Sequence, residues 1–131
     1  MTAVPFDFGE AKAAIDAASG AQKKAENEVK DAYRLYGEAE RSYRRALAQK
    51  ITELRANGIA VSIAQDLARG DAHVADLRLK RDIKDGLREA AKSAIFRHTA
   101  DRRELEQLID WSLRRELAES GPQPQWTRAA A

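Results

Sequence analysis

Five basic residues have the clearest spacing for chemistry in this chain, and that chemistry would be phosphate binding. Their steps of three or four place them along one side of a helix. They are Arg78, Arg81, Lys84, Arg88 and Lys92. Acidic residues run beside them, and Asp85–Arg88 and Glu89–Lys92 have the i,i+3 spacing of helical ion pairs. The pattern therefore leaves two interpretations open, a nucleic-acid-binding line and a solvated, salt-bridged face.

The residue types that carry catalysis or metal binding are sparse. The chain has no cysteine and two histidines, His73 and His98, which lie far apart and outside any metal-binding spacing. His98 falls in an apolar stripe, where a hydrogen-bonded core histidine is the simpler interpretation. No nucleophile–base pair, phosphate-binding glycine loop or converging carboxylate pair can be picked out. The sequence therefore predicts no enzyme, no metal site and no cofactor.

Two large aromatic residues lie away from the apolar stripe of their helix. With Leu105 at 0° and about 100° per residue, Phe96 falls near 180°, Ala100 near 220° and Trp111 near 240°. We expect Phe96, Ala100 and Trp111 to make an intermolecular contact, with either a dimer partner or a target protein. Alternatively, the N-terminal Phe6 and Phe8 fold back onto this surface, or the aromatics are exposed singly.

A first long helix is predicted over about residues 9–57. Its apolar positions follow a mean step of about 3.6 residues, which is the α-helical period. Asn57-Gly58 would end it, because glycine readily takes the left-handed conformation. The stripe consists of Ala11, Ile15, Ala18, Gln22, Ala25, Val29, Tyr33, Tyr36, Glu40, Tyr43, Leu47, Ile51 and Leu54.

A second long helix is predicted over about residues 71–119, with Asp71 as its N-cap. "SGPQPQ" ends it, and residues 121–131 are predicted to be a disordered tail. Its core stripe is expected to consist of Ile83, Leu87, Ala91, Ala94, His98, Leu105, Ile109 and Leu113.

Residues 62–69, between the two, read as a short helix opened by a capping box of Ser62 and Gln65. Nearby aliphatic residues are expected to cover an apolar end of the fold, namely Ile59, Val61, Ile63 and Leu67. The stretch also resembles a helix-turn-helix, but its turn is two residues too short and the following helix is far longer than a recognition helix. We therefore favour an elbow.

Two helices of similar length joined by a short elbow predict an all-α, antiparallel helical hairpin, coiled-coil-like, within a single domain of residues 1–120. Glu40 is the one acidic residue in the first stripe. In a register that turns near residue 64 it would lie beside Arg88, so Glu40–Arg88 is the expected register-setting pair.

The composition suits elongated helices more than a compact core. Apolar residues make up 44%, but alanine dominates them, and charged residues make up 34%. We therefore expect a partner to complete the fold, with a homodimer favoured among homo-oligomers. The net charge is only +2, and its distribution, −3 over residues 1–40 and +5 over residues 41–131, falls short of the dense basic cluster that is typical of nucleic-acid binders. No run of about 18–20 apolar residues predicts a membrane span, and we expect a cytoplasmic location.

The segments "LARGDAHVADLRLKRD" and "DRRELEQLIDWSLRREL" resemble small helical proteins of tailed phages and prophages of Gram-positive bacteria. The resemblance covers roughly residues 30–118. Those proteins are encoded among early replication or recombination genes, and the resemblance implies an accessory protein acting on DNA-processing or host-defence machinery. It implies no catalytic residues.

Together these patterns predict a non-enzymatic helical interaction protein, a phage-type accessory or inhibitor that binds a host or phage protein. The first alternative is a nucleic-acid-binding accessory of a replication or recombination module. The second is a structural or assembly protein, which would form open-ended polymers.

Overall fold

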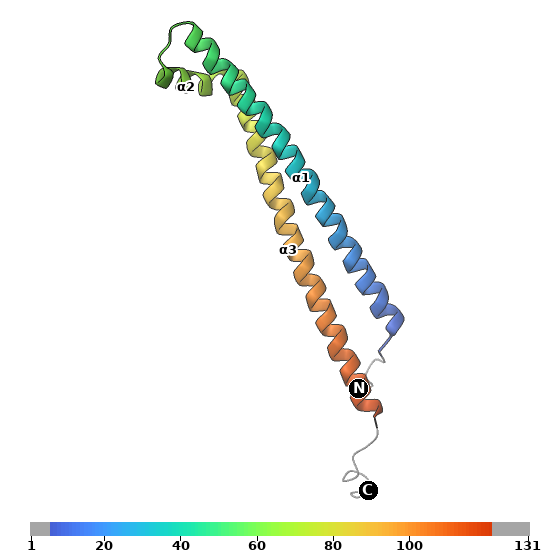
Figure 1. Cartoon of the computed structure of the whole chain (residues 1–131). Helices are drawn as coiled ribbons and strands as arrows, with labels where there is room; N and C mark the ends of the chain where they lie inside the picture. The colour runs from blue at the N-terminus through green and yellow to red at the C-terminus, as the bar shows by residue number, and fades with distance from the viewer. Residues whose placement is uncertain (1–5, 122–131) are drawn as a thin grey trace, which may run out of the picture. The chain divides into compact units, whose positions relative to one another are not determined.

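The computed structural model describes residues 6–121, and these form three helices and no strand (Figure 1). Helix α1 spans Phe8–Ala56, α2 spans Val61–Gly70 and α3 spans Ala72–Ser120. The all-α class is therefore confirmed. Each bound differs by one residue from the 9–57, 62–69 and 71–119 expected from the sequence. The disordered tail was expected over residues 121–131, and residues 122–131 of it lie outside the described residues.

Both ends of α1 are closed by local hydrogen bonds. At its start, Asp7 Oδ1 accepts hydrogen bonds from the backbone N–H groups of Gly9 and Glu10, at 2.8 and 3.1 Å. At its end, Gly58 takes φ +84°, and its N–H donates to Arg55 O at 3.0 Å. The N–H of Ile59 donates to Leu54 O at 3.2 Å. This pair of bonds is a Schellman motif, so the glycine stop is confirmed.

The starts of α2 and α3 differ in how they are capped. Asp71 caps α3 as expected, because its Oδ2 accepts a hydrogen bond from the N–H of Val74 at 3.2 Å. The capping box expected for α2 is wrong. Ala60 occupies the N-cap and makes no side-chain cap bond, and Ser62 lies one residue inside the helix.

The chain divides into two compact units, and α1 and α3 contribute a segment to each. Unit 1 joins Met1–Lys23 with Arg97–Ala131, of which residues 6–23 and 97–121 are described. Unit 2 is Lys24–Phe96 and contains α2. The single domain of residues 1–120 stays a prediction, and each unit is described by itself below.

In unit 2 the segments of α1 and α3 contact each other and run in opposite directions. Lys50 of α1 lies 3.6 Å from Asp71 at the start of α3. Ten residues earlier in α1, Glu40 lies 3.4 Å from Arg81, which is ten residues later in α3. The apolar contacts are few: Tyr43, Ala46 and Val74 form the buried cluster, with Leu47 and Leu77 packed against it.

The α1 face that meets α3 in unit 2 follows a heptad repeat, which shares four positions with the stripe expected for this helix and adds Ala32, Ala39 and Ala46 to it. Alanine occupies every seventh position, at Ala25, Ala32, Ala39 and Ala46, and all four are buried or half-buried. The positions between them are also buried or half-buried; they are Val29, Tyr36 and Tyr43. Steps of four and three give a mean period of 3.5, the spacing of a left-handed helix pair.

The core stripe expected for α3 is wrong for its first two residues, Ile83 and Leu87, whereas Ala91 and Ala94 of unit 2 are half-buried as expected. Ile83 and Leu87 are 53% and 54% exposed, while the residues turned toward α1 are half-buried Arg81, Lys84 and Arg88. The alanines of α1 explain this arrangement, since their small side chains leave room for long basic ones. The aliphatic stems of these basic residues can pack there while their charged ends reach the rim.

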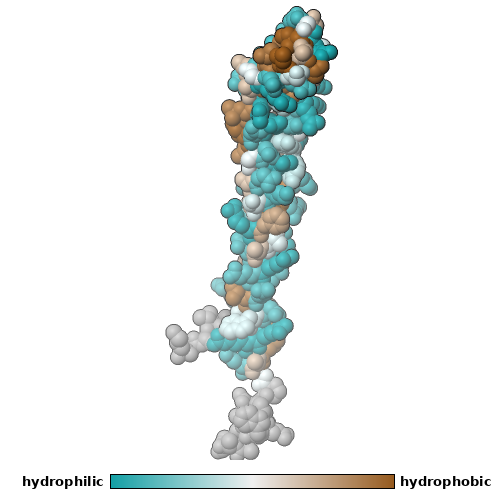
Figure 2. Space-filling model, turned by 90° about the vertical axis from the view of Figure 1, so that its left-hand side faces the viewer, coloured by the Kyte–Doolittle hydropathy of each residue, from teal (hydrophilic) through white to brown (hydrophobic). Residues whose placement is uncertain are grey.

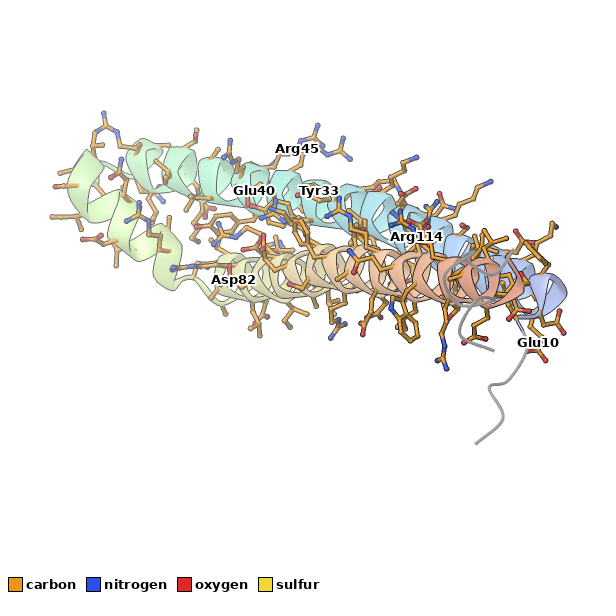
Figure 3. The ribbon with its side chains drawn as sticks, turned by 90° about the horizontal axis from the view of Figure 1, so that it is seen from below. Glu10, Tyr33, Glu40, Arg45, Asp82 and Arg114 are labelled. Atoms are coloured by element: carbon orange, nitrogen blue, oxygen red, sulfur yellow. The ribbon has the colours of Figure 1, made fainter. Side chains whose placement is uncertain are left out.

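The register pair differs from the expected one. Arg81, and not Arg88, meets Glu40, and Arg81 also bonds Asp82 at 2.9 Å. Glu40 lies between α1 and α3, whereas Arg45 points away from α3 (Figure 3). The expected register turned near residue 64, which placed α3 about two helical turns too far along α1. The pairing of Glu40 with Arg88 is therefore wrong.

Unit 1 is held by polar contacts between its two helical segments. Gln22 of α1 accepts a hydrogen bond from Arg102 at 3.1 Å and donates one to Thr99 at 3.4 Å. Near the end of α3, Glu116 accepts a hydrogen bond from the N–H of Phe6 at 3.4 Å. The segments again run antiparallel. Every described side chain of unit 1 is half-buried or exposed.

Candidate interaction surfaces

In helix α2 two small residues are buried and three larger aliphatic residues are exposed. Ala64 and Ala68 are completely buried, whereas Val61, Ile63 and Leu67 are about half exposed. The expectation that these aliphatic residues cover an apolar end of the fold is therefore wrong for these three. Apolar side chains gather at the end of unit 2 that carries α2 (Figure 2). Val61, Ile63 and Leu67 are called the α2 patch below.

A second apolar surface lies on the solvent side of α3 in unit 2. Leu79, Ile83 and Leu87 recur every four residues, so they share a face of the helix, and each exposes more than half of its surface. These three residues are called the α3 stripe. Their exposure follows from the core face described above, because basic residues occupy the positions that meet α1.

The five basic residues expected to bind phosphate differ in their exposure. Arg78 and Lys92 are exposed, but the Arg81 and Arg88 side chains are only 22% and 23% exposed. The guanidinium of Arg81 lies 4.6 Å from the ring centroid of Tyr43. That of Arg88 lies 4.2 Å from the ring centroid of Tyr36. Two of the five cations are thus engaged within the unit.

The carboxylates beside these two arginines strengthen their engagement. The hydrogen bond that Arg81 donates to Asp82 raises the pKa of Arg81 above its ordinary value. Partial desolvation lowers the pKa of Arg88, but the hydrogen bond and the charge of Asp85 outweigh this, so the net shift is upward. Both groups therefore stay charged at any physiological pH and are already neutralised by neighbouring acids.

This arrangement predicts that the protein does not bind duplex DNA. We expect no gel shift even at about 50 mM salt, where phosphate contacts are strongest. Phosphates approaching Arg78 or Lys92 would also meet the acidic Asp82, Asp85 and Glu89. A retarded band that weakens when Arg78 and Lys92 are changed to alanine would contradict the prediction. Arg41→Ala and Arg44→Ala, on exposed positions of α1, are the matched controls.

The three residues expected to contact another protein are exposed but fall in different units. Phe96 is 68% exposed and belongs to unit 2, while Ala100 and Trp111, the latter 60% exposed, belong to unit 1. Their exposure agrees with the predicted second face of the helix. Whether they bind a protein stays a prediction.

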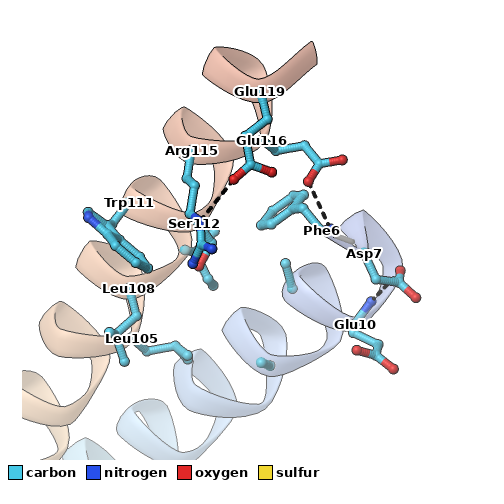
Figure 4. Close-up of a pocket in the computed structure, with 13 residues that line it drawn as sticks. Phe6, Asp7, Glu10, Leu105, Leu108, Trp111, Ser112, Arg115, Glu116 and Glu119 are labelled. Atoms are coloured by element: carbon cyan, nitrogen blue, oxygen red, sulfur yellow. Dashed lines mark hydrogen bonds and ion pairs between the residues drawn. The ribbon is translucent and has the colours of Figure 1, made fainter. Parts of the chain in front are cut away.

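Trp111 and Phe6 line a cleft of about 530 Å³ in unit 1 (Figure 4). Phe6 and Phe8 pack edge to face, with ring centroids 4.7 Å apart. Phe6 therefore lies in the same cleft as Trp111, as in the alternative in which Phe6 and Phe8 fold back onto the aromatic surface. The cleft also carries Arg115, which stacks over Trp111 at 5.6 Å and pairs with Glu119 at 3.2 Å.

Sequence reasoning missed the α2 patch and the α3 stripe as surfaces. The signal for the first is the spacing of Ala64 and Ala68, four residues apart on one face, which marks a close helix contact. The signal for the second is the alanine in every seventh position of α1, because it fixes which face of α3 approaches. In both cases the larger aliphatic residues were expected to be covered, but they are exposed.

In the described part of the chain, no cluster of three histidine, aspartate or glutamate side chains could hold a metal ion. None of the helices there is long and apolar enough to cross a membrane. In comparisons with known proteins, no family model matches the chain, and neither a curated protein nor a solved structure is significantly similar to it.

Proposed function

We propose that the chain is a non-enzymatic interaction protein, an antiparallel helical hairpin that binds another protein through the α2 patch. In this proposal it self-associates as a dimer and acts by occupying a surface of its partner. The resemblance drawn from the sequence would make it a phage-type accessory protein. The partner would then belong to DNA-processing or host-defence machinery, in the host cytoplasm.

The observation that carries this proposal is the orientation of α2. A short helix between two long ones needs only one apolar face for folding, and Ala64 and Ala68 supply it with complete burial. Val61, Ile63 and Leu67 nevertheless leave about half of their surface in contact with water, at an energetic cost. Clustered aliphatic residues on a surface mark sites of protein contact.

The patch suits a protein partner better than a nucleic acid. Its three side chains are aliphatic and offer neither a cation for phosphate nor an aromatic face for stacking on bases. Aliphatic anchors instead fit an apolar groove or a helix face of another protein, as in helix-in-groove recognition.

Affinity capture from a lysate of a Gram-positive bacterium, treated with nuclease, tests the proposal. We expect wild-type protein to retain a partner that the triple variant Val61→Ser, Ile63→Ser, Leu67→Ser loses, with the same helix content by circular dichroism. The matched control is Phe96→Ser with Trp111→Ser, which removes exposed apolar residues elsewhere. If the α2 variant still captures the partner and the control variant does not, the partner binds at the aromatic residues. That result would overturn the proposal.

A further inference from the structure

The α3 stripe adjoins an apolar groove between the two helical segments of unit 2. Leu87 lines this groove of about 220 Å³ together with Ala32 and Leu35 of α1. Ile83 and Leu79 extend the apolar surface along α3. A helix laid into the groove would cover Leu87 and Leu35 together, as apolar helix faces do in bundles.

Gly86 lies beside Ile83 on the exposed side of α3. It lies three residues after Ile83, inside a long helix, where glycine is among the weakest helix formers. A Cβ atom added at Gly86 would meet nothing within 4 Å, so no contact inside the chain requires the glycine. Ala90 follows four residues later on the same face. Small residues there would let the backbone of another helix come close.

The charges at the rim of the groove are self-complementary. Glu28 and Asp31 of α1 lie on one side, and Lys84 of α3 on the other. When two copies meet through the same surface, each patch must fit itself. If α1 of one copy faces α3 of the next, the acidic rim of each meets the basic rim of the other.

From these features we infer that the α3 stripe and the adjoining groove bind a second copy of this chain. The two copies would pack their unit 2 segments into a four-helix arrangement, with Ile83, Gly86 and Leu87 at its centre. This inference rests on the self-association in the proposed function and names its surface. It leaves the α2 patch free for another partner.

Light scattering of the purified full chain over a range of concentrations tests the inference. We expect a mass of about twice the 14.6 kDa of one chain, falling to that of one chain on dilution. The double variant Ile83→Asp, Leu87→Asp is expected to stay monomeric at concentrations where the wild type is dimeric, with its helix content unchanged. The control variant Phe96→Asp, which changes an even more exposed apolar residue on another face of α3, is expected to remain dimeric.

A second variant separates an interface from a merely exposed helix face. Gly86→Gln should improve the helix, because glutamine is the better helix former. At a close helix contact its side chain has no room, so we expect the dimer dissociation constant to rise at least tenfold. Gly37→Gln is the matched control, since Gly37 of α1 also has open space around its Cβ position and does not line the groove. It should leave the constant unchanged.

Three results would overturn the inference. The first is a mass of one chain at every concentration. The second is a dimer that withstands both the Ile83, Leu87 variant and Gly86→Gln. The third is a dimer that Phe96→Asp dissociates, which would place the contact on the aromatic side of α3. A monomeric protein that still captures a partner through the α2 patch would leave protein binding intact and remove only the self-association.

Discussion

Val74→Asp is expected to be the most destabilising single substitution in this chain, costing about 3–5 kcal/mol. Val74 is 2% exposed and is the largest fully buried side chain among the described residues. It packs with Tyr43 and Ala46 at the start of the α1–α3 contact in unit 2. An aspartate there would place a charge among the apolar side chains of this cluster. The buried cluster has no other residue that could replace the lost packing.

Urea unfolding followed by circular dichroism measures this effect. Ala75→Asp is the matched control, since the neighbouring Ala75 is exposed and its substitution should change the free energy of unfolding by no more than about 0.5 kcal/mol. Equal unfolding midpoints for the two variants would show that the Val74 cluster does not hold α3 against α1.

Ala68→Leu is expected to cost about 1–3 kcal/mol and to release α2 from the rest of unit 2. Ala68 has no exposed surface, and Ala64, one turn earlier, has none either. Three added carbon atoms can fit there only if the helix moves outward. We expect a lower unfolding midpoint and faster tryptic cleavage after Arg69, the last basic residue of α2.

The neighbouring Leu67 supplies the control for this substitution. Leu67 is half exposed, so Leu67→Ala should leave both the unfolding midpoint and the rate of cleavage close to those of the wild type. Unchanged cleavage in Ala68→Leu would mean that α2 tolerates larger residues on its inner face. The distinction drawn above between the two faces of α2 would then be wrong.

The sequence predicts the three helices well because the signals for them are local. Glycine at 58 needs only its own backbone freedom to end α1, and Asp71 caps α3 through an N–H three residues away. Neither depends on what the helix packs against. The one local signal that failed is the capping box at Ser62, because α2 begins at Val61 and its N-cap is Ala60, two residues before Ser62.

The facing sides of the helices could not be predicted with the same success, because they depend on pairs of residues far apart in the chain. An apolar stripe favours Ile83 and Leu87 as core residues, yet the alanines of α1 admit arginine side chains at Arg81 and Arg88. The arginine side chains are stabilised there by contacts of their guanidinium groups with Tyr36, Tyr43 and Glu40. These contacts form in only one register of the two helices. No single-helix pattern contains that information.

Helix α2 assigns folding and recognition to separate residues. Its inner positions, Ala64 and Ala68, are constrained by space, while Val61, Ile63 and Leu67 are not. Substitutions on the outer face can therefore accumulate with little effect on stability. If the binding partner changes during evolution, the exposed residues of α2 can change with it while the fold is kept. Homologues should then vary most at the exposed positions of α2.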